Sequence, residues 1–150
     1  MKAKLIFPLF IAMVLTLSAC GGGSTFQQNQ DKWESQNIDH YRFTVVVGCF
    51  CPFAGAEVTY EVLNGQVVNE TVMPAPDRPD DPTRISDFYQ PYNTIGKVFD
   101  YVEKSVKEAD DTTIQYDPTY GFPSSVTVDQ IKQAVDDEMY LTLSNFEVLH

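Results

Sequence analysis

The chain has 150 residues, of which 21 are acidic and 10 are Lys or Arg, giving a formal net charge of −11. Such an excess of acid is repelled by nucleic acid and by anionic head groups, so the composition argues against a nucleic-acid partner. A cationic partner fits this charge, and so does a solvated surface that resists aggregation, which is the commoner case.

The first 19 residues have the pattern of an export signal. Lys2 and Lys4 precede an apolar run over residues 5–17, which Pro8 interrupts. This run is well short of the roughly 20 residues that a membrane-spanning helix needs, so we predict that residues 1–19 are removed. Their removal takes away two lysines and no acid, which leaves a formal charge of −13.

Leu17-Ser18-Ala19-Cys20 resembles the processing site of a bacterial lipoprotein. The resemblance implies cleavage before Cys20 and a diacylglyceryl group on its sulfur, so the expected partner of the N-terminus is a lipid bilayer. Two or more acyl chains hold a protein stably on a membrane. Residue 21 is glycine and not aspartate. By resemblance to the sorting rule of bacteria with two membranes, this places the protein in the cell envelope, on the outer membrane facing the periplasm.

Residues 20–30 are expected to form a flexible tether, because they combine glycine, serine, glutamine and asparagine. About 120 residues then remain, which suffices for one domain with one core but not for two. The predicted organisation is a signal peptide (1–19), a tether (20–30) and a single domain (31–150).

The domain is predicted to begin with a short helix and a strand. Asp31 and Glu34 have the spacing of a capping box that opens the helix, and Trp33 is expected to attach this helix to the core. Residues 41–47 alternate between apolar and polar side chains, which indicates a strand.

Cys49 and Cys51 are each other's only intramolecular partners once Cys20 is acylated, and an oxidising compartment favours their pairing. Residues i and i+2 of a flat strand lie about 6.7 Å apart between Cα atoms, at the limit for a disulfide. The bond therefore requires a bend, which the flanking Gly48 and Pro52 favour. Its loop is too short for much entropic stabilisation, so the predicted disulfide chiefly fixes local shape.

Residues 57–62 and 66–72 are predicted to form a hairpin with Val62 opposite Val67. Asn64-Gly65 lies between them, and both residues tolerate the positive φ that a type I′ turn demands. Residues 73–93 hold five of the nine prolines. Because proline donates no hydrogen bond to a ladder, this segment is predicted to be a long loop.

In the second half, Thr94 is predicted to cap a helix whose apolar residues recur at helical spacing as far as Ala109. The strands after it are predicted over residues 112–116, 126–129 and 139–148. In the last strand the apolar alternation changes parity, which predicts a bulge or break at Ser144-Asn145.

The order of elements is helix, three strands, loop, helix, three strands. It predicts an α+β fold, with an antiparallel sheet of about six strands and two helices packed on one face.

Several motifs together resemble a family of small bacterial lipoproteins that is catalogued only as a domain of unknown function. They are Trp33 with Tyr41, Cys49-Phe50-Cys51-Pro52, Asn64-Gly65, Tyr116-Asp117-Pro118-Thr119-Tyr120-Gly121-Phe122-Pro123 and Asp136-Asp137-Glu138. The similarity spans roughly residues 31–148. It implies an exported, membrane-tethered single domain, and it transfers no activity, cofactor or functional residue.

The sequence offers no recognised catalytic constellation. His40 and His150 are the only histidines, and the common protease, hydrolase, phosphate-loop and dinucleotide motifs are absent. We predict no catalytic residue, no metal site and no cofactor. Asp136, Asp137 and Glu138 have a spacing that could face a cation, but a solvated acidic turn is the preferred interpretation.

The turn around Asp117 is expected to be held by its carboxylate, which accepts from backbone N–H groups two residues on, with Gly121 at positive φ. Asp117 and the neighbouring rings of Tyr116, Tyr120 and Phe122 form a candidate contact patch.

The preferred function is a non-enzymatic lipoprotein that presents one domain to an envelope protein partner or small ligand. Two alternatives stay open. One is a periplasmic thiol–disulfide protein that uses Cys49 and Cys51. A disulfide between residues two apart is expected to be strained, and strained disulfides have more oxidising potentials. The other is a periplasmic enzyme inhibitor. A zinc site on the cysteines is disfavoured, because two further ligands are needed and only His40 is near in sequence.

Overall fold

The computed structural model describes residues 25–78 and 80–150. The predicted signal peptide, Cys20 and the first part of the tether therefore lie outside the described residues. In the described part of the chain, no helix combines the length and the apolar character that crossing a membrane requires.

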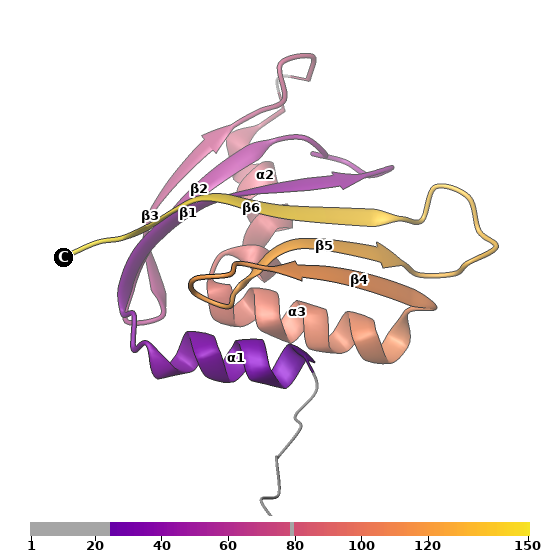
Figure 1. Cartoon of the computed structure of the whole chain (residues 1–150). Coiled ribbons are helices and arrows are strands. Elements are labelled where there is room, and N and C mark those ends of the chain that lie inside the picture. The colour runs from indigo at the N-terminus through magenta and orange to yellow at the C-terminus, as the bar shows by residue number, and fades with distance from the viewer. Residues whose placement is uncertain (1–24, 79) are drawn as a thin grey trace, which may run out of the picture.

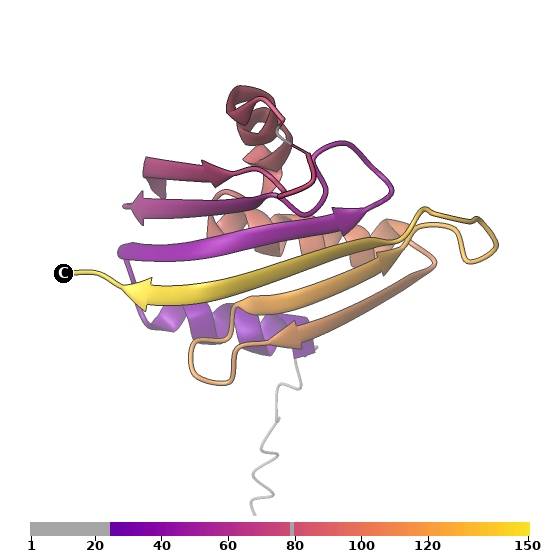
Figure 2. The same cartoon turned by 90° about the horizontal axis from the view of Figure 1, so that it is seen from above.

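The sheet has six strands in the order β3-β2-β1-β6-β5-β4, and every neighbouring pair is antiparallel (Figure 2). The strands are β1 (His40–Cys49), β2 (Glu57–Leu63), β3 (Gln66–Met73), β4 (Asp111–Tyr116), β5 (Pro123–Asp129) and β6 (Met139–Val148). The antiparallel α+β fold predicted from the sequence is confirmed.

The helices lie on one face of the sheet, which curves over them (Figure 1). They are α1 (Thr25–Ser35), α2 (Pro82–Tyr89), the 3-10 helix η1 (Gln90–Tyr92) and α3 (Ile95–Glu108). No helix of residues 25–78 or 80–150 lies on the opposite face of the sheet, as Figure 2 shows, and we call it the open face.

The proline-rich segment is not a loop throughout, so the described part of the chain has three α-helices and not the predicted two. Asp81 caps α2 by accepting a hydrogen bond from the Thr83 backbone N at 2.9 Å, and Pro82 occupies the start of the helix. Proline is tolerated at that position because its missing N–H has no helical partner in any case. Ile85 and Tyr89 then face the core and are fully buried.

The strand alternation produces the core. On β1 and β2 the inward residues are buried at 0–4% exposure: Tyr41, Phe43, Val45, Val47, Val58, Tyr60 and Val62. Val62 pairs with Val67 across the hairpin, as predicted. The bulge in β6 is also confirmed. Asn145 lies at a φ of 52°, and the pairing of β1 with β6 gains one residue on the β6 side. This residue allows Phe146 to turn inward and pack on the core.

α1 begins seven residues earlier than the capping-box pattern suggests, because a helix capped by Asp31 would start at Lys32. Thr25 is its first residue, so residues 25–30, expected in the tether, are helical, and Asp31 lies within the helix and not at its start. The Asp31 carboxylate accepts a hydrogen bond from the Gln27 side chain at 2.7 Å, an i,i+4 contact. Trp33 attaches the helix to the core as predicted, since its ring contacts Tyr41 at 5.4 Å between centroids.

Candidate functional site

One ring of the predicted contact patch around Asp117, that of Phe122, packs inward. The Asp117 carboxylate accepts hydrogen bonds from the backbone N of Thr119 at 2.8 Å and of Tyr120 at 2.7 Å, which confirms the expected turn. Phe122, however, is only 2% exposed, and its ring lies 4.7 Å from that of Phe146. Phe122 is therefore part of the core, and its buried ring is not available to a binding partner.

The same turn is the contact site of α1. Lys32 Nζ donates to the carbonyl of Pro118 at 2.5 Å, and Gln36 Nε2 donates to the carbonyl of Tyr120 at 2.8 Å. Gly121 has a φ of 86°, and a Cβ built there lies 2.7 Å from the Asn29 carbonyl oxygen. The turn needs glycine both for its conformation and for this close approach. Tyr116 and Tyr120 are half-buried beside it.

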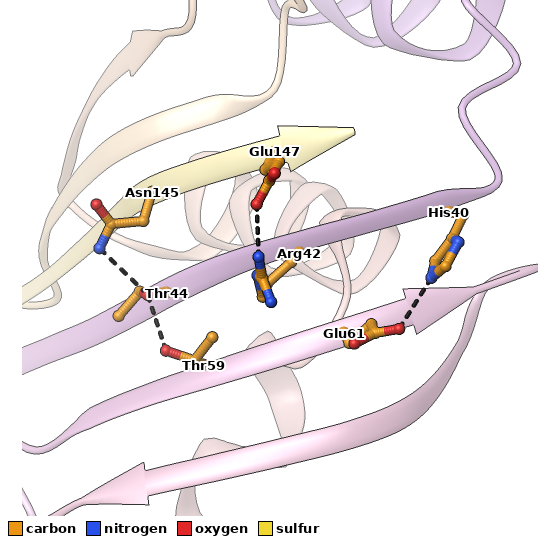
Figure 3. Close-up of polar contacts among 7 residues, drawn as sticks. All are labelled: His40, Arg42, Thr44, Thr59, Glu61, Asn145 and Glu147. Carbon is orange, nitrogen blue, oxygen red and sulfur yellow. Dashed lines mark hydrogen bonds and ion pairs between the residues drawn. The ribbon is translucent and has the colours of Figure 1, made fainter. Parts of the chain in front are cut away.

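Cross-strand polar pairs occupy the end of the open face near the β2–β3 hairpin and the C-terminus (Figure 3). His40 Nε2 lies 2.9 Å from Glu61, and Arg42 forms an ion pair with Glu147 at 2.6 Å. The hydroxyls of Thr44 and Thr59 are 2.9 Å apart, and Asn145 lies within 3.4 Å of Thr44. Each such pair adds a few tenths of a kcal/mol to about 1 kcal/mol to the sheet. These polar groups satisfy one another.

The opposite end of the sheet carries the β1–β2 loop (residues 50–56) and the β5–β6 loop (residues 130–138). We call it the loop end. Both loops lie there because Cys49 at the end of β1 pairs with Met139 at the start of β6. The predicted Cys49–Cys51 disulfide is present, with the two Cα atoms 5.1 Å apart. It bends the chain so that the ring of Phe50 lies 84% exposed.

A hollow of about 430 Å³ lies beside Phe50, at the loop end of the open face. It is lined by Gly48, Cys49, Phe50, Asp136, Glu138 and Tyr140. Tyr140 pairs with Gly48 across the strands, and its Cβ and ring lie 3.5–3.7 Å from where a Cβ on Gly48 would stand. Gly48 therefore adds backbone and no side chain to the lining of the hollow next to Tyr140.

The β1–β2 loop is fixed by contacts on its helical side. Gly55 donates its backbone N–H to the Val47 carbonyl at 2.7 Å, and Arg78 donates to the carbonyl of Ala54. The guanidinium of Arg84 lies 5.2 Å from the centroid of the Phe53 ring. These contacts hold the part of the loop that follows the disulfide against its helical side.

The β5–β6 loop is fixed by carboxylates. Asp137 accepts from the backbone N of Ile131 at 2.7 Å, and Asp110 accepts from the backbone N of Lys132 at 3.0 Å. Partial burial, followed by the nearby charges of Asp137 and Glu138, raises the pKa of Asp129. The predicted acidic turn is thus one part of a wider cluster of like charges at the loop end. Within residues 25–78 and 80–150, no set of three or more potential ligands is arranged to hold a metal ion.

Sequence reasoning missed the hollow. The outward parity of Tyr140 was readable, because Met139, Leu141 and Leu143 alternate inward around it. No sequence signal showed that Phe50 and Asp136 lie beside Tyr140, since the two loops are about 85 residues apart in the chain and adjoin only through the β1–β6 pairing.

A protein-family model described as "Family of unknown function (DUF6174)" matches residues 25–148. The chain belongs to this family, which spans the whole described domain from the first residue of α1 to the last of β6. No curated protein and no solved structure matches the chain.

Proposed function

We propose that this member of a family of unknown function is a lipid-anchored binding protein of the bacterial cell envelope. It binds a protein partner through the loop end and the adjoining open face of its sheet. The exposed Phe50, fixed between two bonded cysteines at the edge of a hollow, is the observation that carries the proposal. Exposed aromatic anchors beside a pocket are typical of binding surfaces.

The short segment between the lipid anchor and α1 supports the proposal. Only Gly21-Gly22-Gly23-Ser24 separates Cys20 from Thr25, the first residue of α1. A fully extended chain covers at most about 18 Å between these two residues. An acylated Cys20 therefore holds the start of α1 close to the bilayer.

The place of α1 in the fold supports a defined orientation of the domain on the membrane. α1 packs beneath the sheet beside α3, with the rings of Phe26 and Phe99 5.9 Å apart (Figure 1). An anchor at the start of α1 turns this helical layer toward the membrane and the open face toward the periplasm. A partner in solution or on another envelope layer then meets the open face first.

The charge around the cysteines favours a structural role for the disulfide. Asp136 and Glu138 line the hollow next to Cys49. Nearby negative charge opposes formation of the thiolate, which is the reactive form in thiol–disulfide exchange. In this proposal the disulfide shapes the binding surface and takes no part in a redox reaction.

Two measurements on the full chain, expressed in a bacterium with two membranes, test the proposal. Mass spectrometry of the purified protein is expected to find Cys20 at the N-terminus with its lipid. The variant Cys20→Ala is expected to leave the membrane fraction. An unprocessed N-terminus contradicts the anchor.

For the binding surface, a photo-crosslinking amino acid is placed at Thr142 on the open face or, as a control, at Glu103 on α3. Adducts to a partner are expected from position 142 and not from position 103. Equal labelling from both positions contradicts a specific surface on the sheet.

A further inference from the structure

We infer that the hollow between Phe50 and Tyr140 binds an arginine side chain of the protein partner. This inference rests on the proposed function and adds the chemistry of the partner to it. The hollow combines two aromatic rings, two carboxylates and a glycine floor at the loop end of the open face. A second hollow on the other side of Phe50 shares Asp136 and Glu138, but Gly48 and Tyr140 do not line it.

The rings provide the flat walls. Phe50 is 84% exposed and Tyr140 is 51% exposed, although both are large side chains that normally gain from burial. A guanidinium is planar and weakly hydrated, so it stacks on aromatic faces better than an ammonium does. Arg84 already lies 5.2 Å over the ring of Phe53 in the same loop, which shows that a guanidinium fits against a ring there.

The carboxylates provide the charge. Within the described residues, three surface acids have a Lys or Arg partner, since Arg42 binds Glu147, Lys107 binds Glu103 and Lys104 lies near Glu108. Asp136 and Glu138 have no cation in such a pair. A carboxylate and a guanidinium form short, charge-assisted hydrogen bonds, often two in parallel. The hollow is thus complementary in charge to an arginine.

The hollow is preformed, which reduces the entropic cost of binding. The disulfide fixes Phe50 from both sides, and Asp136 is held at a φ of 69° in a loop that Asp137 closes through its bond to Ile131. Gly48 is part of the lining, and a Cβ there would already be in van der Waals contact with Tyr140.

The test uses the full chain in detergent micelles and a capped peptide, Gly-Gly-Arg-Gly-Gly, followed by amide NMR shifts. The peptide is expected to shift the resonances of Gly48, Phe50 and Tyr140. The same peptide with citrulline, which is neutral and of equal shape, is expected to bind about tenfold more weakly or not at all. Equal binding of both peptides, or equal binding of a lysine peptide, overturns the inference.

Matched variants of the protein complete the test. The pair D136N and E138Q is expected to weaken arginine binding about tenfold, and Phe50→Ala about threefold to tenfold. Asparagine tolerates the positive φ of residue 136, so the loop keeps its shape. The control pair E103Q and E108Q removes the same charge from α3 and is expected to bind as the wild type does.

If the control pair loses as much affinity as the site pair, the attraction is general electrostatics and the inference fails. Because the peptide experiment needs neither the lipid nor the natural partner, it can fail while Cys20 processing and crosslinking at residue 142 succeed. If the peptide binds as expected but Cys20 processing and crosslinking at residue 142 fail, the arginine site stands and the proposed envelope function does not.

Discussion

The two ends of the sheet carry the most distinctive motifs of the chain, and the structure uses them differently. At one end, the turn from Asp117 to Phe122 receives α1, and its rings meet Trp33 and Phe146. At the loop end, Phe50 and Tyr140 are also aromatic and also flank a turn, but no element covers them. Aromatic residues beside a turn thus form core at one end and surface at the other.

The difference has a simple cause. α1 buries none of its own residues completely, yet it covers the turn with Trp33 and the stem of Lys32. At the loop end, none of the described helices lies above the open face. An apolar patch left open in a stable domain marks an interaction site more often than a packing defect. This contrast leads to three predictions.

The largest effect is expected at the packed end. Gly121→Ala places a Cβ 2.7 Å from the Asn29 carbonyl oxygen at a φ of 86°, so both strain and the loss of α1 docking destabilise the fold. We expect the free energy of unfolding to fall by about 2–4 kcal/mol, measured by urea denaturation. Gly65→Ala is the control, since its φ is 74° but nothing lies within 4 Å, and it should cost only about 1 kcal/mol. Equal losses in both variants would mean that α1 does not depend on the turn.

A smaller effect on stability is expected at the loop end. Replacing Cys49 and Cys51 together by serine opens a ring of three residues, for which the chain-entropy model gives at most about 2 kcal/mol. Affinity for the arginine peptide should fall more clearly, because Phe50 loses its fixed position. Phe50→Ala, the control, should change stability by less than about 0.5 kcal/mol. A loss above about 4 kcal/mol in the serine variant would place the disulfide in the core.

The smallest effect concerns pH. The pKa of Asp129 is raised by its partial burial and by the neighbouring carboxylates, so its charge opposes folding at neutral pH. The folded protein gains stability as the pH falls through this raised pKa and loses it as the pH rises again. Asp129→Asn should therefore raise the melting temperature at pH 7, and the gain over wild type should shrink in acid. Asp87→Asn on α2 is the control. A gain that is constant across pH would contradict a charge effect.

Local patterns were sufficient wherever neighbours in sequence decide the structure. The alternation in residues 41–47 and 57–62 predicted the buried faces of β1 and β2, and Asn64-Gly65 predicted the hairpin. The parity change in β6 predicted its bulge, and Thr94 predicted the cap of α3.

Local patterns misled where packing decides. The prolines suggested a loop, but Pro82 starts α2, which is stable because Ile85 and Tyr89 reach the core. The mostly polar composition of residues 25–30 suggested a tether, but Phe26 in this segment packs on Phe99 of α3, and the segment is part of α1. Phe122 beside Asp117 suggested a surface, but Trp33 of α1 packs on its ring.

The sequence by itself determined the strands, the hairpin, the disulfide pair and the α+β class, because each depends on alternation, turn chemistry or proximity along the chain. Only the tertiary structure decided which aromatic residues are core and which face solvent. That choice depends on whether a distant element covers them, and burial is a property of the assembled layers. The hollow at Gly48 exists for the same reason, since the β1–β6 pairing brings its two loops together.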